Sequence, residues 1–196
     1  MNYIKFLAVA FAMTIAMSAS AKSSADALKG YNRVELSYAP LFVGDVAASG
    51  GWTSYSPSST MHGFAADYTR GIHVTKNLPM FIEVGGGIQF NRANECNILR
   101  LNVPANFTYR FAVGSAKVWK ISPYTGLNFG FNPVNDFIND KLFQLGWNAG
   151  CNFTYKRFLL GVGYTFDFMP IAEYNMMGVS DDVYSGTLKV KVGFEF

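Results

Sequence analysis

The sequence is poor in charge, cysteine and histidine, and each shortage narrows the possible functions. Charged residues make up 15% of the 196 residues, and the formal net charge is only +3. Such a small positive surplus gives no electrostatic basis for binding nucleic acid. The two histidines and two cysteines do not follow the spacing of a metal motif. We therefore expect no nucleic-acid partner, no cofactor and no metal.

The two cysteines, Cys96 and Cys151, lie in unlike surroundings. Cys96 falls in a polar segment, whereas Cys151 falls inside an alternating apolar pattern. An exported protein can form a disulfide bond, but two unmatched contexts favour free thiols. We predict free thiols and keep a disulfide as the alternative.

Long apolar runs are absent except near the start of the chain. Residues 6–17 are apolar or small, Lys5 precedes them, and Ala19 and Ala21 stand at the −3 and −1 positions of a cleavage site. This pattern predicts a signal peptide over residues 1–21. A retained helical anchor is the weaker alternative, because such an anchor needs about 20 apolar residues.

Cleavage after Ala21 would start the mature chain near Lys22, followed by a short periplasmic segment over residues 22–30. No cysteine follows the apolar run, so the signal is not that of a lipoprotein. After the signal, no run of about 18 apolar residues occurs, which excludes transmembrane helices.

Aromatic residues are abundant, at 16% of the chain, and many of them alternate with polar residues. The clearest cases are residues 99–111 and 141–156, where apolar and polar side chains take turns. A period of two indicates β-strands with unlike faces. Both exceed the usual five or six residues, whereas a tilted transmembrane strand needs about 9 to 11.

Weaker copies of this pattern bring the expected total to eight strands. Long connections over residues 44–61 and 170–183 fall on the same side as the moderate ones, and short turns fall on the other. An even strand number with short periplasmic turns is typical of outer-membrane barrels. The expected strands are residues 31–43, 62–74, 80–92, 99–111, 118–132, 141–156, 158–169 and 184–196.

The composition of the polar face suggests which side of the barrel faces inward. This face is rich in Gly, Asn, Gln, Thr and Ser, which suits the crowded lumen of an eight-stranded barrel. A soluble, lipocalin-like barrel with its apolar face inward is the alternative. Charged residues of both signs on the inward face should form a lumen network, because unpaired buried charge is costly. They are Arg33, Glu35, Asp67, Glu83, Arg100, Arg110, Asp167, Lys189, Lys191 and Glu195.

Aromatic residues near the ends of the strands predict two interfacial girdles on the outward face. The girdle toward the short turns comprises Phe107, Tyr109, Phe111, Tyr155 and Phe158. The girdle toward the long loops comprises Phe90, Phe129, Phe131, Phe166 and Phe168.

The last strand, residues 186–196, has apolar residues at every second position counted back from Phe196. It resembles the targeting signature of outer-membrane barrels, and the region 31–196 resembles small eight-stranded barrels of the OmpA/OmpX type. The resemblance implies an outer-membrane location and recognition of the last strand by the barrel-assembly machinery. Pro104 departs from the pattern, because proline cannot donate to a strand ladder, and predicts a local bulge.

The residues give little sign of catalysis. Some outer-membrane barrels modify lipids with a Ser, a His and an acid near the external rim, and only His62 could serve here. No motif brings a hydroxyl and a carboxylate to it, and His73 should lie at the opposite end of the same strand. We therefore predict no catalytic, cofactor-binding or metal-binding residue, and leave lipid modification open.

The expected function is structural or adhesion-like, acting through the external loops. Loop 44–61 carries Trp52 and Tyr55, and loop 170–183 carries Tyr174 and two methionines. Loops held on a rigid scaffold are common binding surfaces. A small pore is the alternative, although eight strands normally leave a filled interior. Membrane lipids are the other expected partner.

Overall fold

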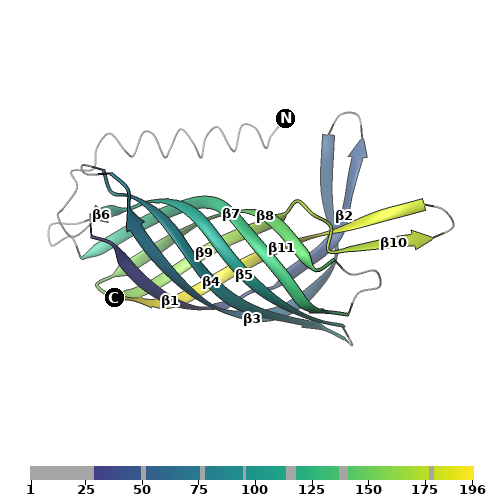
Figure 1. Cartoon of the computed structure of the whole chain (residues 1–196), viewed down its shortest axis with the longest axis horizontal. Helices are drawn as coiled ribbons and strands as arrows, with labels where there is room; N and C mark the ends of the chain where they lie inside the picture. Colours follow the sequence, from purple (N-terminus) through teal and green to yellow (C-terminus); the bar gives the residue numbers. More distant parts are fainter. Residues whose placement is uncertain are drawn as a thin grey trace.

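The chain folds as an antiparallel β-barrel in the computed structural model (Figure 1). The structure describes residues 29–49, 52–75, 78–94, 96–113, 118–136, 141–176 and 179–196. The predicted signal peptide over residues 1–21 and most of the segment 22–30 lie outside these residues. The described part of the chain contains no helix long and apolar enough to cross a membrane.

The strand segments follow one another around the wall. In chain order they are β1 (Tyr31–Tyr38), β2 (Leu41–Ser49), β3 (Trp52–His73), β4 (Met80–Ala93), β5 (Cys96–Tyr109), β6 (Phe111–Val113), β7 (Trp119–Asn135), β8 (Phe143–Tyr155), β9 (Phe158–Asp167), β10 (Ala172–Met176) and β11 (Val179–Glu195).

Short breaks divide three of the barrel strands into segments. β2 continues β1 after Ala39 and Pro40, β6 continues β5 after Arg110, and β10 follows β9 after residues 168–171. Counted as continuous strands they make eight. β1 pairs with β11, from Arg33 opposite Glu195 to Tyr38 opposite Val190, and this pairing closes the barrel. The predicted eight-stranded antiparallel barrel is confirmed.

The apolar face of the wall points outward. Along β1, Val34 and Leu36 are exposed, whereas the alternate residues Arg33 and Glu35 are buried. The other strands repeat this alternation, so a band of large apolar side chains encircles the barrel, as in proteins that span the outer membrane. This arrangement overturns the lipocalin-like alternative, in which the apolar face would line the interior.

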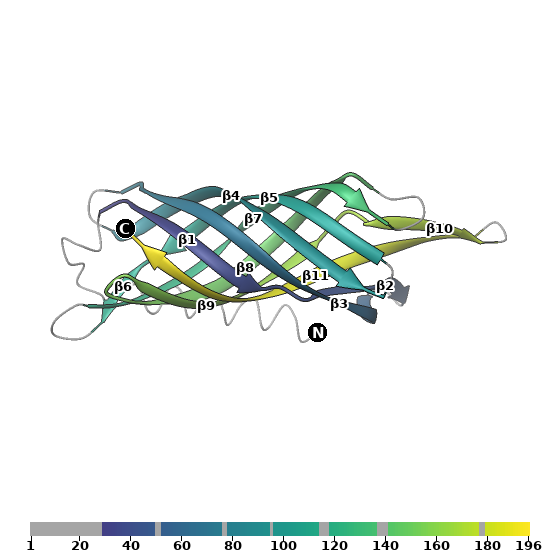
Figure 2. The ribbon, with the colours of Figure 1, turned by 90° about the horizontal axis from the view of Figure 1, so that it is seen from below.

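Two segments predicted to be loops are instead paired strands. The expected loop 44–61 folds as a hairpin in which β2 pairs with β3 up to Ser49 opposite Trp52. The expected loop 170–183 contains β10, which pairs with β11 up to Met176 opposite Val179. Both hairpins extend from the end of the barrel opposite β6 and the C-terminus (Figures 1 and 2). The prediction of long loops there was therefore wrong.

The predicted bulge at Pro104 is also wrong. Toward β4 the register is unchanged, with Val84 opposite Ala105 and Gly87 opposite Asn102. The two intervening positions form no pair in this ladder, as expected where proline removes a backbone donor. Pro104 interrupts the ladder without shifting it.

A bulge does occur between β5 and β7, closer to the hairpin end. Leu99 lies opposite Val134, but Leu101 lies opposite Phe131, so β7 has one extra residue there. The extra length includes Pro133, which suits a bulge because no regular ladder bond is required of it.

The aromatic girdles are largely as predicted. Tyr109 and Phe111 are exceptions, because each is only 6% exposed and their rings lie 4.5 Å apart at the break between β5 and β6. Phe131 and Phe166 are intermediate in exposure. The predicted members that are exposed are Phe90, Phe107, Phe129, Tyr155, Phe158 and Phe168.

Candidate functional site

The lumen near the short turns is filled by an ionic network centred on Arg33. Its guanidinium lies 3.2 Å from Glu35, 3.2 Å from Glu83 and 3.9 Å from Glu195. Tyr31 donates a hydrogen bond from its hydroxyl to Glu83. All these residues are at least nine-tenths buried. Three strands, β1, β4 and β11, thus contribute to one cluster.

Arg110 extends this network toward the mouth at the short turns. It is ion-paired with Glu195, and its guanidinium lies 3.7 Å from the centre of the Tyr31 ring. Lys120 also reaches Glu195, at 3.0 Å. Lys120 was not among the predicted members, although its inward position on β7 follows from the alternation. The Arg110 Nε atom has no hydrogen-bond partner among the described residues.

Two lysines on β11, the strand next to β1, also join the network. Lys191 lies 3.2 Å from Glu35, and Lys189 lies 2.9 Å from Asp67. A separate pair lies closer to the hairpin end, where Arg100 on β5 is 2.9 Å from Asp167 on β9. All ten predicted lumen charges are therefore paired inside the barrel.

Hydrogen bonds hold the Arg100–Asp167 pair in place. Arg100 also donates to Asn132, at 3.0 Å, and to Ser185, at 3.3 Å. Ser185 in turn donates to Asp167. Asp167 is the single carboxylate paired with Arg100 in the described structure.

Tyr124 crosses the lumen and explains two of the glycines there. A methyl group at Gly163 or Gly150 would collide with the Tyr124 hydroxyl. The ammonium of Lys191 lies 4.6 Å from the centre of the Tyr124 ring. Glycine at these positions therefore makes room for a larger neighbour, which the sequence did not identify as Tyr124.

A central cavity of about 40 Å³ remains among these groups. Its lining includes Arg33, Asn106 and Asn148, each with a buried polar atom that lacks a partner in the described structure. A buried water needs about 10 to 15 Å³ and two or more polar partners. The cavity is therefore suited to two or three waters and is too small for an organic ligand.

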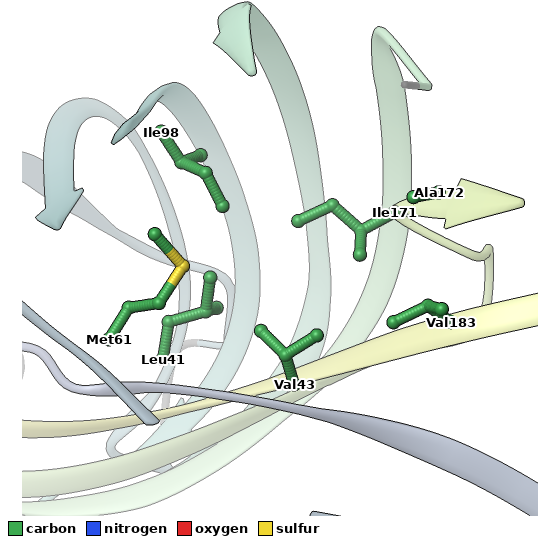
Figure 3. Packing of buried hydrophobic residues seen from close by; sticks show 7 residues of the cluster. All are labelled: Leu41, Val43, Met61, Ile98, Ile171, Ala172 and Val183. Carbon is green, nitrogen blue, oxygen red and sulfur yellow. The ribbon is translucent and has the colours of Figure 1, made fainter. Parts of the chain in front are cut away.

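An apolar cluster closes the lumen at the hairpin end (Figure 3). Ile171 belongs to this cluster and is fully buried. Its backbone N–H donates to the Val183 carbonyl, and its own carbonyl accepts from the backbone N–H of Lys141 and from the side chain of Asn135. This plug was not predicted, because several of its members fell in or beside the segments predicted to be loops. It consists of Leu41, Val43, Met61, Ile98, Ile171, Ala172 and Val183.

The two histidines lie at different positions along β3 and have separate hydrogen-bond partners. His62 is exposed on the outer wall, and its Nδ1 lies 2.5 Å from the Tyr38 hydroxyl. His73 is the last residue of β3, and its Nε2 lies 2.8 Å from the Leu78 carbonyl oxygen. No cluster of three metal-ligating side chains occurs among the described residues. Cys96 and Cys151 are free thiols, as predicted.

Comparison with known proteins identifies the fold. The sequence matches no protein-family model and no curated relative. The structure is similar to Neisserial surface protein A, with a TM-score of 0.51, 17% identity, and coverage of 85% of this chain and 97% of that one. It is also similar to the outer membrane enzyme PagL, with a TM-score of 0.50 and 11% identity. That match covers 83% of this chain and 98% of PagL.

A third similar structure is Ail, the attachment invasion locus protein of Yersinia pestis. Its TM-score is 0.49 at 15% identity, and the match covers 86% of this chain and 99% of that one. The fold is common to proteins with different activities, so it does not assign one. The closed wall, its apolar exterior and the similarity to Neisserial surface protein A and PagL show that the chain has the fold of a small eight-stranded outer-membrane β-barrel.

Proposed function

We propose that this protein displays two β-hairpins at the cell surface and contacts an external partner through them. The observation that supports this role is that the barrel wall continues into both hairpins on the side opposite the short turns. In outer-membrane barrels the short turns are periplasmic. The hairpins would therefore face the cell exterior.

Backbone pairing connects the two hairpins at their base. β2 pairs with β11 from Leu41 opposite Thr187 to Asp45 opposite Val183. β10, β11, β2 and the start of β3 thus form one continuous sheet above the barrel. A hydrogen-bonded platform presents side chains at fixed spacing, which lowers the entropy lost when a partner binds.

The composition of the two hairpins suggests the chemistry of that partner. Residues 44–61 and 170–183 contain no Lys or Arg. The side chains of residues 45–58 and 174–181 lie outside the described ones, so this step rests on the sequence. An acidic surface with large aromatic and thioether groups suits a partner with basic and apolar patches. The relevant residues are Asp45, Trp52, Tyr55, Glu173, Tyr174, Met176, Met177, Asp181 and Asp182.

The test compares cells that express the full chain with cells whose hairpins are shortened. Residues 46–55 and 174–181 would each be replaced by a two-residue Asn-Gly turn, which suits a tight hairpin. We expect the full chain to increase adherence to protein-coated and cell-covered surfaces, and the shortened chain to lose that increase. Equal adherence at equal amounts of folded barrel would reject the proposal.

We also propose that the protein is not an enzyme. The described neighbour of His62 is a tyrosine, whereas nucleophilic or general-base chemistry would need a serine or carboxylate within hydrogen-bond reach. Mass spectrometry of lipid A and phospholipids, with and without expression, tests this point. A mass change that disappears in a His62→Ala variant would establish catalysis.

The proposal also includes how the chain is exported and inserted into the outer membrane. We infer cleavage after Ala21, which N-terminal sequencing of the purified protein would check. We also infer that the assembly machinery reads the last strand through Phe196, which is 59% exposed on the outer wall. A Phe196→Ala variant should accumulate in the periplasm in unfolded form, whereas normal insertion would count against that inference.

A further inference from the structure

The barrel mouth at the short turns contains an open pocket of about 460 Å³. A pocket of this size is within the range of small-molecule sites. It is separate from the hairpins, which lie at the other end of the molecule (Figure 2). Its charged lining residues are Lys29, Arg110, Lys120, Lys156, Arg157 and Glu195.

The charge of the side chains in this pocket is strongly unbalanced, because five cationic side chains surround one acidic side chain. At the opposite rim, the described charged side chains include Arg92 and Lys141 together with Asp136, Glu173 and Asp182. Among the described residues, the positive surplus is therefore confined to one mouth. A cleft lined by charges of one sign concentrates its field and attracts ions of the opposite sign.

The floor of the pocket is rigid, and it contains an unused donor. Arg110 is 1% exposed and is held between the Tyr31 ring and Glu195. Its Nε donor has no hydrogen-bond partner among the described residues. A buried guanidinium donor normally finds an acceptor in protein, water or ligand. An anion above this floor could supply that acceptor.

The rim of the pocket is formed in part by the two-residue turn between β8 and β9. Lys156 has a φ of 54°, a left-handed conformation that favours Gly, Asn or Asp over lysine. The turn is fixed on both sides, since Lys156 N–H donates to Val118 at 2.9 Å and the Arg157 carbonyl accepts from Glu195 at 2.8 Å. Two adjacent cations are thus placed at the mouth by a backbone that would suit other residues better.

We propose that this mouth binds a phosphate-bearing anion on the periplasmic side of the membrane. Glu195 already provides one negative charge to Arg110 and Lys120. A ligand must bring more than one further charge to balance the remaining cations, which favours a phosphate group over a single carboxylate. Guanidinium and ammonium groups donate charge-assisted hydrogen bonds to phosphate oxygens. The group could belong to a soluble phosphate compound or to the headgroup of an anionic phospholipid.

Calorimetric titration of the purified full-length barrel with pyrophosphate, in neutral phosphatidylcholine nanodiscs, tests the site. We expect saturable binding, weakened at least tenfold in a Lys156→Gly/Arg157→Ser double variant. The matched control, Arg92→Ser/Lys141→Ser, removes two cations from the opposite rim and should bind as the unaltered protein does. Heat-dependent gel migration would verify that each variant is folded.

Two results would overturn the proposal: no saturable binding by the unaltered protein, or equal weakening in both double variants. Native mass spectrometry from nanodiscs that contain phosphatidylglycerol identifies the source of the phosphate. Phosphatidylglycerol retained by the unaltered protein and lost by Lys156→Gly/Arg157→Ser assigns a lipid headgroup. Pyrophosphate binding without retained lipid assigns a soluble ligand.

Discussion

Buried charges in this lumen differ in how many partners they have. Arg33 lies within ion-pair distance of three carboxylates, whereas Arg100 is paired with Asp167 alone. Removing one partner of a buried pair leaves the other charge uncompensated, and this cost exceeds the stability that the intact pair provides. Arg100 should therefore be more sensitive than Arg33 to loss of a single neighbour.

We predict that Asp167→Asn lowers the free energy of unfolding by about 3 to 5 kcal/mol, since it leaves Arg100 charged and buried. Glu173→Gln is the control, because the Lys141–Glu173 pair is more than a third exposed and should contribute at most about 1 kcal/mol. Urea unfolding in detergent micelles, followed by tryptophan fluorescence, measures both. Similar small changes in the two variants would contradict the importance of burial.

Lys156 allows a prediction with the opposite sign. Its left-handed φ of 54° is unfavourable for a residue with a Cβ atom. Lys156→Gly should therefore raise the free energy of unfolding by about 0.5 to 1 kcal/mol, because glycine adopts this conformation without strain. Urea unfolding followed by tryptophan fluorescence also tests this prediction. A loss of stability would mean that the lysine side chain contributes more than its backbone costs.

At the scale of the strands, alternation of apolar and polar residues predicted the wall well but not its length. The pattern weakens in Gly- and Ser-rich stretches, so β3 was expected to begin at residue 62, whereas it begins at Trp52. The first half of β3 is held by backbone pairing with β2, which leaves little trace in side-chain periodicity. The lengths of the connections therefore predicted the correct topology, but the predicted loops were longer than those in the structure.

In the lumen, too, the sequence pattern predicted which residues point inward but not which of them meet. Inward charges could be assigned residue by residue, because one face of a strand fixes all of its alternate positions. Which charges meet depends on strand tilt and stagger, which the sequence does not display. Tyr124 was missed for the same reason, because it meets Gly163 and Lys191 on strands that are not its neighbours in the wall.

Contact between β7 and β9 provides a third prediction. A methyl group at Gly163 would meet the hydroxyl of Tyr124, so Gly163→Ala should destabilise the barrel by about 1 to 3 kcal/mol. In a Tyr124→Phe background the hydroxyl is gone, and the cost of Gly163→Ala should fall by at least half. A double-mutant cycle of unfolding free energies measures this coupling. Additive effects would show that the two residues do not meet.

For the whole molecule, the interior is obstructed at two depths. The ionic network fills the half near the short turns, and the apolar plug fills the hairpin end. A cavity of only about 40 Å³ remains, and it lies within the ionic network. The arrangement is that of a filled barrel and gives no support to the pore alternative.

We expect the purified protein to show no stepwise conductance in planar lipid bilayers. The reason is that ion passage would require separating several buried ion pairs and displacing the plug around Ile171. A known porin measured in the same bilayers is the positive control. Reproducible steps that scale with salt concentration would restore the pore alternative.

The pairing of charges across the lumen has a consequence for how the chain enters its membrane. Asp67 and Lys189 are separated by 122 residues, and Arg100 and Asp167 by 67. In both pairs the two residues lie on strands that are not neighbours in the wall. A hairpin inserted alone would carry such charges into lipid without their counter-ions, which is costly. We therefore expect the strands to insert together, as a curved sheet that keeps its inner side in water until its two edges meet.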